Sequence, residues 1–139
     1  MKRNLIIILA IFVAMQFIQT EKINKNTPKN LEIKAPVHIK TMLKNACYDC
    51  HSNEVRWPWY SNIAPFSWII DDHVNNGRSA LNFSEWENYT EEEKKKELKE
   101  IFRTAYASMP LSGYIRFHEE ADLTREQRTM IREWTGVKK

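Results

Sequence analysis

The residues best suited to chemistry form one short run, Cys47-Tyr48-Asp49-Cys50-His51. Two cysteines three positions apart, followed at once by a histidine, form the C-x-x-C-H pattern of c-type haem attachment. Two thiols at this spacing near a helix end can reach two vinyl groups on one porphyrin edge and form thioethers. His51 then lies beneath the iron and can supply an imidazole nitrogen as the proximal ligand. The motif uses both cysteines of the chain and predicts one covalent haem c.

Three other chemistries use similar cysteine patterns. A disulfide between residues three apart is strained and closes almost no loop, so it stabilises little. A thioredoxin-type redox pair requires a strand-helix-strand context. A zinc site could add a histidine from elsewhere, but adjacent cysteine and histidine are awkward co-ligands, and zinc sites favour a second paired cluster. The sequence favours haem and leaves a haem-free module, binding zinc or exchanging disulfides, as the alternative.

The second axial ligand of the iron must come from later in the chain, and Met109 is the leading candidate. Pro110 disfavours helical geometry at the residue before it, so we expect Met109 in an extended loop that can present its thioether to a metal. His118 is the rival ligand if Met109 does not serve. His73 lies on an apolar helix stripe and suits a core position or a hydrogen bond to a haem propionate. A methionine ligand opposite histidine would raise the reduction potential of the iron.

Other residues near the motif are candidates for shaping the site. Trp57-Pro58-Trp59-Tyr60 could cover a haem edge and exclude water. Arg56 and Arg78 are candidate partners for propionates. By analogy with other metal-bound histidines, a backbone carbonyl near Pro58 or Pro65 is a candidate acceptor for the free ring nitrogen of His51.

The elements that must position these residues have helical periodicity. Apolar residues recur three and four positions apart, as in Ile39, Met42, Leu43 and Ala46, and no segment has a convincing period of two. Two capping boxes, Thr90 with Glu93 and Thr124 with Gln127, predict helix starts. Gly77 is the expected stop of a helix that begins near Pro65. The pattern predicts an all-α domain with helices over about 36–46, 65–77, 90–105 and 124–136.

The first residues of the chain indicate export. Lys2 and Arg3 precede a run from Leu5 to Ile18 that is apolar except for Gln16, the form of an export signal. As a helix, this run would span about 21 Å, short of the roughly 30 Å hydrocarbon core of a bilayer. However, no cleavage site of the Ala-x-Ala kind follows it. We therefore expect residues 1–20 to be a signal peptide or, preferably, an uncleaved membrane anchor, followed by a tether over 21–35 and the haem-binding domain over 36–136.

The residues also resemble a known family, the haem-binding domain family of small exported monohaem c-type cytochromes. The resemblance extends from about Pro36 to Trp134 and is carried by the C-x-x-C-H run, Arg56-Trp57-Pro58-Trp59-Tyr60-Ser61, Asp72-His73-Val74, Leu81-Asn82-Phe83-Ser84, Met109-Pro110, Tyr114 and His118. It implies a cytochrome c-like helical fold, covalent haem held by Cys47, Cys50 and His51, and a domain that faces the periplasm. It implies Met109 as the distal ligand with less support.

These observations predict the function. The 139 residues carry 21 basic and 18 acidic side chains, too even a balance for a nucleic-acid-binding surface. No paired acid and base residues indicate an enzyme. We expect an electron carrier with His/Met-ligated iron, tethered by its N-terminal helix on the periplasmic side of the bacterial inner membrane and serving periplasmic or membrane redox proteins. The alternative is a haem-based sensor or peroxidase-like protein with an exchangeable sixth ligand.

Overall fold

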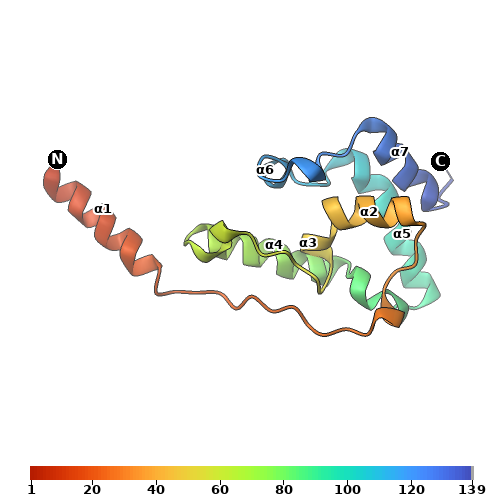
Figure 1. Cartoon of the computed structure of the whole chain (residues 1–139), viewed down its shortest axis with the longest axis horizontal. Coiled ribbons are helices and arrows are strands. Elements are labelled where there is room, and N and C mark those ends of the chain that lie inside the picture. Colours follow the sequence, from red (N-terminus) through yellow and green to blue (C-terminus); the bar gives the residue numbers. More distant parts are fainter. Residues whose placement is uncertain (139) are drawn as a thin grey trace.

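The computed structural model describes residues 1–138, and every regular element in that range is helical (Figure 1). The all-α prediction is therefore confirmed. The α-helices are α1 (Lys2–Met15), α2 (Val37–Ala46), α3 (Tyr48–His51), α4 (Phe66–Ala80), α5 (Glu91–Ala107), α6 (Ser112–Ile115) and α7 (Arg125–Trp134). Four short 3₁₀ helices lie between them: η1 (Lys29–Leu31), η2 (Trp59–Asn62), η3 (Phe83–Asn88) and η4 (Glu119–Ala121).

Both predicted capping boxes are present. Before α5, the Glu93 amide donates to the Thr90 hydroxyl (3.3 Å) and the Thr90 amide donates to the Glu93 carboxylate (2.8 Å). Before α7, Thr124 and Gln127 make the same reciprocal pair. Each box satisfies backbone donors that the first helical turn leaves without partners, so local sequence fixes where α5 and α7 begin.

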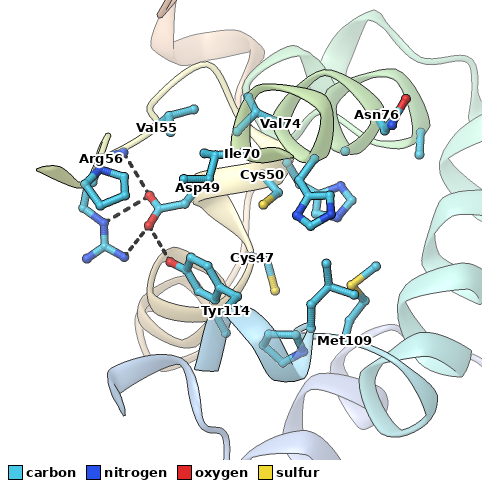
Figure 2. Close-up of a pocket in the computed structure, with 18 of the residues that line it drawn as sticks. Cys47, Asp49, Cys50, Val55, Arg56, Ile70, Val74, Asn76, Met109 and Tyr114 are labelled. Atoms are coloured by element: carbon cyan, nitrogen blue, oxygen red, sulfur yellow. Dashed lines mark hydrogen bonds and ion pairs between the residues drawn. The ribbon is translucent and has the colours of Figure 1, made fainter. Parts of the chain in front are cut away.

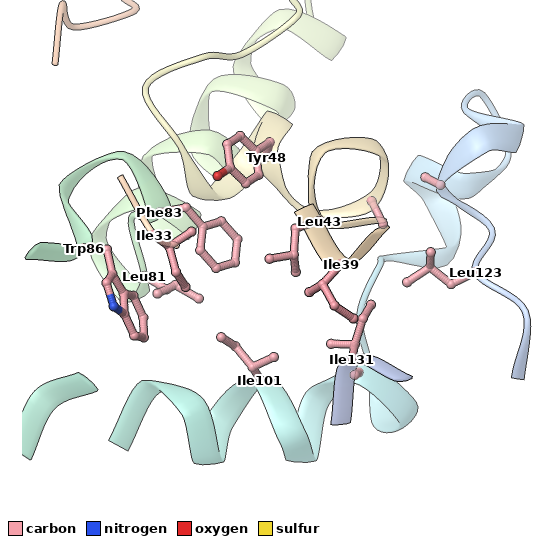
Figure 3. Close-up of a cluster of buried hydrophobic side chains, with 13 residues drawn as sticks. Ile33, Ile39, Leu43, Tyr48, Leu81, Phe83, Trp86, Ile101, Leu123 and Ile131 are labelled. Carbon is pink, nitrogen blue, oxygen red and sulfur yellow. The ribbon is translucent and has the colours of Figure 1, made fainter. Parts of the chain in front are cut away.

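One hydrophobic core joins α2, α5 and α7 (Figure 3). The predicted apolar stripes supply its centre, since Ile39, Leu43 and Ile131 are at most 1% exposed. Phe83, from η3, is equally buried and stacks on Tyr48 of α3 with ring centroids 5.2 Å apart. The core therefore reaches the turn that carries the C-x-x-C-H motif and fixes it from one side.

Helix α4 runs further than predicted. We expected Gly77 to end this helix, but Gly77 lies inside it and the helix continues to Ala80. Gly77 is buried against α3, and a Cβ atom there would lie 2.4 Å from the carbonyl oxygen of Cys50. The glycine is thus explained by the close approach of two backbones rather than by a helix stop.

The N-terminal region contains helix α1 and the segment 21–35 that follows it. Helix α1 projects from the domain (Figure 1), and the Gln16 side chain, just after it, exchanges two hydrogen bonds with the backbone of Ala64 (3.0 and 3.1 Å). In the described part of the chain, no helix combines the length and apolarity needed to cross a membrane.

The segment expected to be a tether, 21–35, packs against the domain over much of its length. The Asn24 side chain exchanges two 2.9 Å hydrogen bonds with the backbone of Val55. Ile33 is 3% exposed, belongs to the core, and its amide donates to the Phe83 carbonyl (2.9 Å). Much of the segment is therefore a structural part of the domain.

Candidate functional site

Two adjoining cavities, of about 260 and 380 Å³, border the turn that carries the C-x-x-C-H motif. Their walls contain all four residues that the sequence singled out. Cys47, His51 and Met109 line both cavities, and Cys50 lines the first. Apolar side chains supply most of the remaining wall, with Ile70, Val74 and Leu111 in the first cavity and Leu43, Ile101 and Ile131 in the second. Cavities of this size and character are typical of cofactor sites.

A single helical turn brings the two cysteines together. The Cys50 and His51 amides both donate to the Cys47 carbonyl (3.2 and 2.9 Å). Figure 2 shows the two sulfur atoms directed into the same space. Gly77 holds α4 against Cys50 on one side, and Tyr48 holds the turn in the core on the other. The attachment turn is therefore fixed from both sides before any ligand binds.

The His51 ring is oriented by a backbone carbonyl. Its Nδ1 donates to the carbonyl oxygen of Leu81 (3.2 Å), which leaves Nε2 free to bind a metal. Our expectation of an acceptor near Pro58 or Pro65 was wrong, because the end of α4, not the loop before it, lies beside this ring. Burial lowers the pKa of His51 below its ordinary value, which favours the neutral imidazole that metal ligation requires.

Burial favours the protonated form of both cysteine thiols. Burial raises the pKa of Cys47 to about 12 and that of Cys50 to about 11. Thiol exchange and zinc binding both need thiolates. In addition, residues 1–138 contain no grouping of three or more His, Cys, Asp or Glu side chains that could hold a metal ion. Neither observation supports a haem-free module that binds zinc or exchanges disulfides.

Met109 and the candidate histidines differ in position. Met109 follows α5, and its backbone carbonyl accepts a hydrogen bond from Nη1 of Arg128 (2.6 Å). His118 lines neither cavity: its Nε2 pairs with the Tyr60 hydroxyl (2.7 Å) and its ring stacks on Tyr114, with centroids 4.2 Å apart. His73 is exposed at the first cavity. The structure thus brings Met109, and not His118, to the same walls as His51.

Sequence reasoning missed one feature, a buried carboxylate inside the motif. Asp49 is 6% exposed and accepts hydrogen bonds from Arg56 and from the Tyr114 hydroxyl (Figure 2). Arg56, expected as a propionate partner, is therefore paired within the protein. Arg78, the other expected partner, donates from Nε to the Ser52 carbonyl (2.7 Å). An acidic residue between the two cysteines was the available signal, but its partner Tyr114 is 65 positions away.

Comparison with known families places this site in context. The chain matches the model of the haem-binding domain family over residues 10–136, and it belongs to that family. The match begins within α1, well before the stretch from Pro36 on which the resemblance rested. No curated protein and no solved structure matches the chain. The family membership makes it a haem-binding protein.

The residues present suit a haem. Two thiols on one turn, an imidazole with a free Nε2 and a thioether line one apolar space. This donor set is the one that c-type haem uses for attachment and for His/Met ligation.

Proposed function

We propose that the protein is a membrane-tethered c-type cytochrome that carries single electrons. The observation that supports this most is the convergence of Cys47, Cys50, His51 and Met109 on one cavity system. The first three belong to a single turn, whereas Met109 comes from a loop 58 positions after His51. The fold therefore brings together four possible haem-binding groups from two parts of the chain that are far apart in the sequence.

Each residue has a defined role in this proposal. Cys47 and Cys50 would add their S–H groups across two vinyl C=C bonds, so that two C–S bonds form without other reagents entering the product. His51 Nε2 and the Met109 sulfur would ligate the iron. When bound, the haem supplies a one-electron iron couple whose potential is raised by a methionine ligand. Leu81 orients the His51 ring through its carbonyl, and the apolar walls exclude water.

This ligand set favours a carrier over an enzyme. His51 and Met109 would together hold the iron, and a substrate would then find no open position on it. The alternative, a sensor or peroxidase-like protein, requires Met109 to be absent from the iron or readily displaced.

The N-terminal helix supports a membrane location. Side chains all around α1 are apolar and exposed, among them Leu5, Ile8 and Leu9 at 60% exposure or more. Exposed apolar surface of this extent on one helix is stabilised by lipid rather than by water. We infer that α1 tethers the domain to the periplasmic side of the inner membrane, where the partners would be periplasmic or membrane redox proteins.

A ligand-replacement experiment tests the proposal. The chain is produced with a cytochrome c maturation system, and Met109→Ala is compared with Met130→Ala, a control at an exposed methionine on α7. The wild type and Met130→Ala should show a sulfur-to-iron charge-transfer band and bind carbon monoxide poorly. Met109→Ala should lose the band, bind carbon monoxide and have a lower potential. A high-spin ferric spectrum of the wild type would instead support the sensor or peroxidase-like function.

A further inference from the structure

The Asp49 carboxylate is fully engaged by the polypeptide. Its Oδ1 accepts from the backbone amide (3.0 Å) and Nε (3.1 Å) of Arg56, and its Oδ2 accepts from Arg56 Nη2 (3.0 Å) and from the Tyr114 hydroxyl (2.5 Å). A carboxylate this buried is costly unless it is paired and hydrogen-bonded. Arg56 supplies three of these four hydrogen bonds, and Tyr114 supplies the one that comes from the segment after Met109.

Tyr114 reaches this carboxylate from the opposite wall of the cavity. It lies on α6, five positions after Met109 and in the same connection between α5 and α7. The two segments that Tyr114 joins are therefore the attachment turn and the loop that carries the proposed distal ligand. Burial raises the pKa of Tyr114 far above its ordinary value, so the hydroxyl keeps its proton and remains a donor.

Few other side chains of this loop are well buried. Leu111, Ser112, Gly113, Arg116 and Phe117 are all exposed. His118 adds a second link, because it stacks on Tyr114 and bonds to Tyr60, which follows the attachment turn. A loop with so little buried apolar surface depends on its polar contacts to stay closed.

We propose that Asp49, Arg56 and Tyr114 form a latch that keeps the Met109 loop closed against the attachment turn, and so controls how often Met109 leaves the iron. All three are positioning residues, since none is proposed to ligate the metal. The role of the latch at the iron rests on the proposed function, but the closure of the loop itself does not. An open loop would leave a bound haem iron accessible to external ligands, so the opening frequency would set how fast they bind.

Tyr114→Phe tests the latch by removing one oxygen and leaving the ring that stacks on His118. Loss of a buried hydrogen bond to a charged group should make loop opening about tenfold more frequent or more. Ferrous holoprotein should then bind carbon monoxide about tenfold faster, while the sulfur-to-iron band of the ferric form weakens. The matched control is Tyr106→Phe, whose hydroxyl bonds to Arg125 and Thr129, outside the residues that line either cavity. Equal carbon monoxide rates in wild type, Tyr114→Phe and Tyr106→Phe would overturn the proposal.

A double-mutant cycle separates the latch from general packing. In an Asp49→Asn background, Tyr114→Phe should have a clearly smaller effect on the carbon monoxide rate, because the charged acceptor has already gone. Identical effects in the two backgrounds would show that Tyr114 acts independently of Asp49 and would contradict the latch.

Amide hydrogen exchange of residues 109–117 provides a readout that does not use the haem spectrum. In the purified holoprotein, these amides should exchange about tenfold faster in Tyr114→Phe than in wild type or Tyr106→Phe. Unchanged exchange would refute the latch even if haem attachment is confirmed. Conversely, if production with the maturation system gives a colourless protein that still has the expected exchange pattern, the latch is preserved and the proposed function is refuted.

Discussion

The two faces of the attachment turn are built differently. On one face, Tyr48 stacks on Phe83 inside a core filled by side chains from α2, α5 and α7. On the other, Cys47 and Cys50 border cavities, and the opposite wall is connected to the turn by hydrogen bonds to Asp49. The core face is filled by the chain's own apolar side chains and borders the second cavity along Leu43, Ile101 and Ile131, whereas the cavity face leaves room for a cofactor to supply further contacts. The side of the turn that carries Tyr48 therefore contributes mainly to the core, and the side that carries the two thiols is the one that can bind a cofactor.

Replacement of the two thiols should produce the largest difference in amide protection between the core face and the cavity face. In Cys47→Ser/Cys50→Ser we expect no covalent haem at all. Amides of α4 and of residues 109–117 should lose protection from exchange, while those of α5 and α7 keep most of it, because these two helices also pack with α2 in the core. Amide exchange of the variant and the wild-type holoprotein measures this. Loss of protection throughout both regions would mean that the core also needs the haem.

A truncation in the core should have the opposite signature. Ile39→Ala removes a side chain that is 1% exposed and lines neither cavity, and it should lower the free energy of unfolding by about 2–5 kcal/mol. The haem spectrum should stay unchanged, since the iron ligands and the cavity walls remain. Denaturant unfolding is the measurement, with Val37→Ala, at an exposed position on the same helix, as the control. An altered spectrum in Ile39→Ala would show that the two faces are coupled.

A close backbone contact lies at the boundary between the α3 turn and α4. In Gly77→Ala the new Cβ would overlap the Cys50 carbonyl, and we expect a loss of about 1–3 kcal/mol together with a smaller fraction of chains that carry haem. Gly113→Ala is the matched control, because a Cβ there has no neighbour within 4 Å. Haem content and unfolding should be measured on both. Equal behaviour of the two variants would contradict the tight packing of α3 on α4.

The reactivity of the thiols should report burial at the cavity face. With pKa values of about 12 for Cys47 and 11 for Cys50, above the ordinary value, few thiolates exist at pH 8 in the folded haem-free chain. Alkylation by iodoacetamide should be at least tenfold slower than in urea, and should accelerate as the pH rises towards 11. Fast alkylation of the folded chain at pH 8 would show that the cavity face is open to solvent.

The smallest effect is expected at a helix start on the surface. Thr90→Ala removes the capping side chain of α5 and should lower the free energy of unfolding by about 1 kcal/mol, with haem content and spectrum unchanged. Thermal unfolding is sufficient to detect this. A changed spectrum would mean that α5 transmits strain to Met109, which follows it.

Local signals made most of the helices predictable, and distant contacts did not. The capping boxes at Thr90 and Thr124 depend on residues three apart, and the structure contains both. Gly77 was misinterpreted because its reason is the approach of Cys50, which no local pattern reveals. The packing of the expected tether was missed for the same reason, since its few apolar residues have no sustained helical spacing and the partner of Ile33, Phe83, is 50 positions away.

In the candidate site, too, residues close in sequence could be predicted, whereas contacts between distant residues could not. Cys47, Cys50 and His51 are adjacent in sequence and could be predicted as a unit. Met109 could be proposed from Pro110 beside it, but its place at the cavity required the fold. The hydrogen bond between Asp49 and Tyr114 joins residues 65 positions apart, and only the fold brings them together.

The central claim is covalent attachment of one haem to this chain. The most direct measurement is the mass and absorption of the purified, denatured protein after production with a cytochrome c maturation system. We expect a red protein with the mass of the polypeptide plus one haem, and loss of that increment in Cys47→Ser/Cys50→Ser. A colourless wild-type protein with the mass of its amino acids alone would contradict the claim.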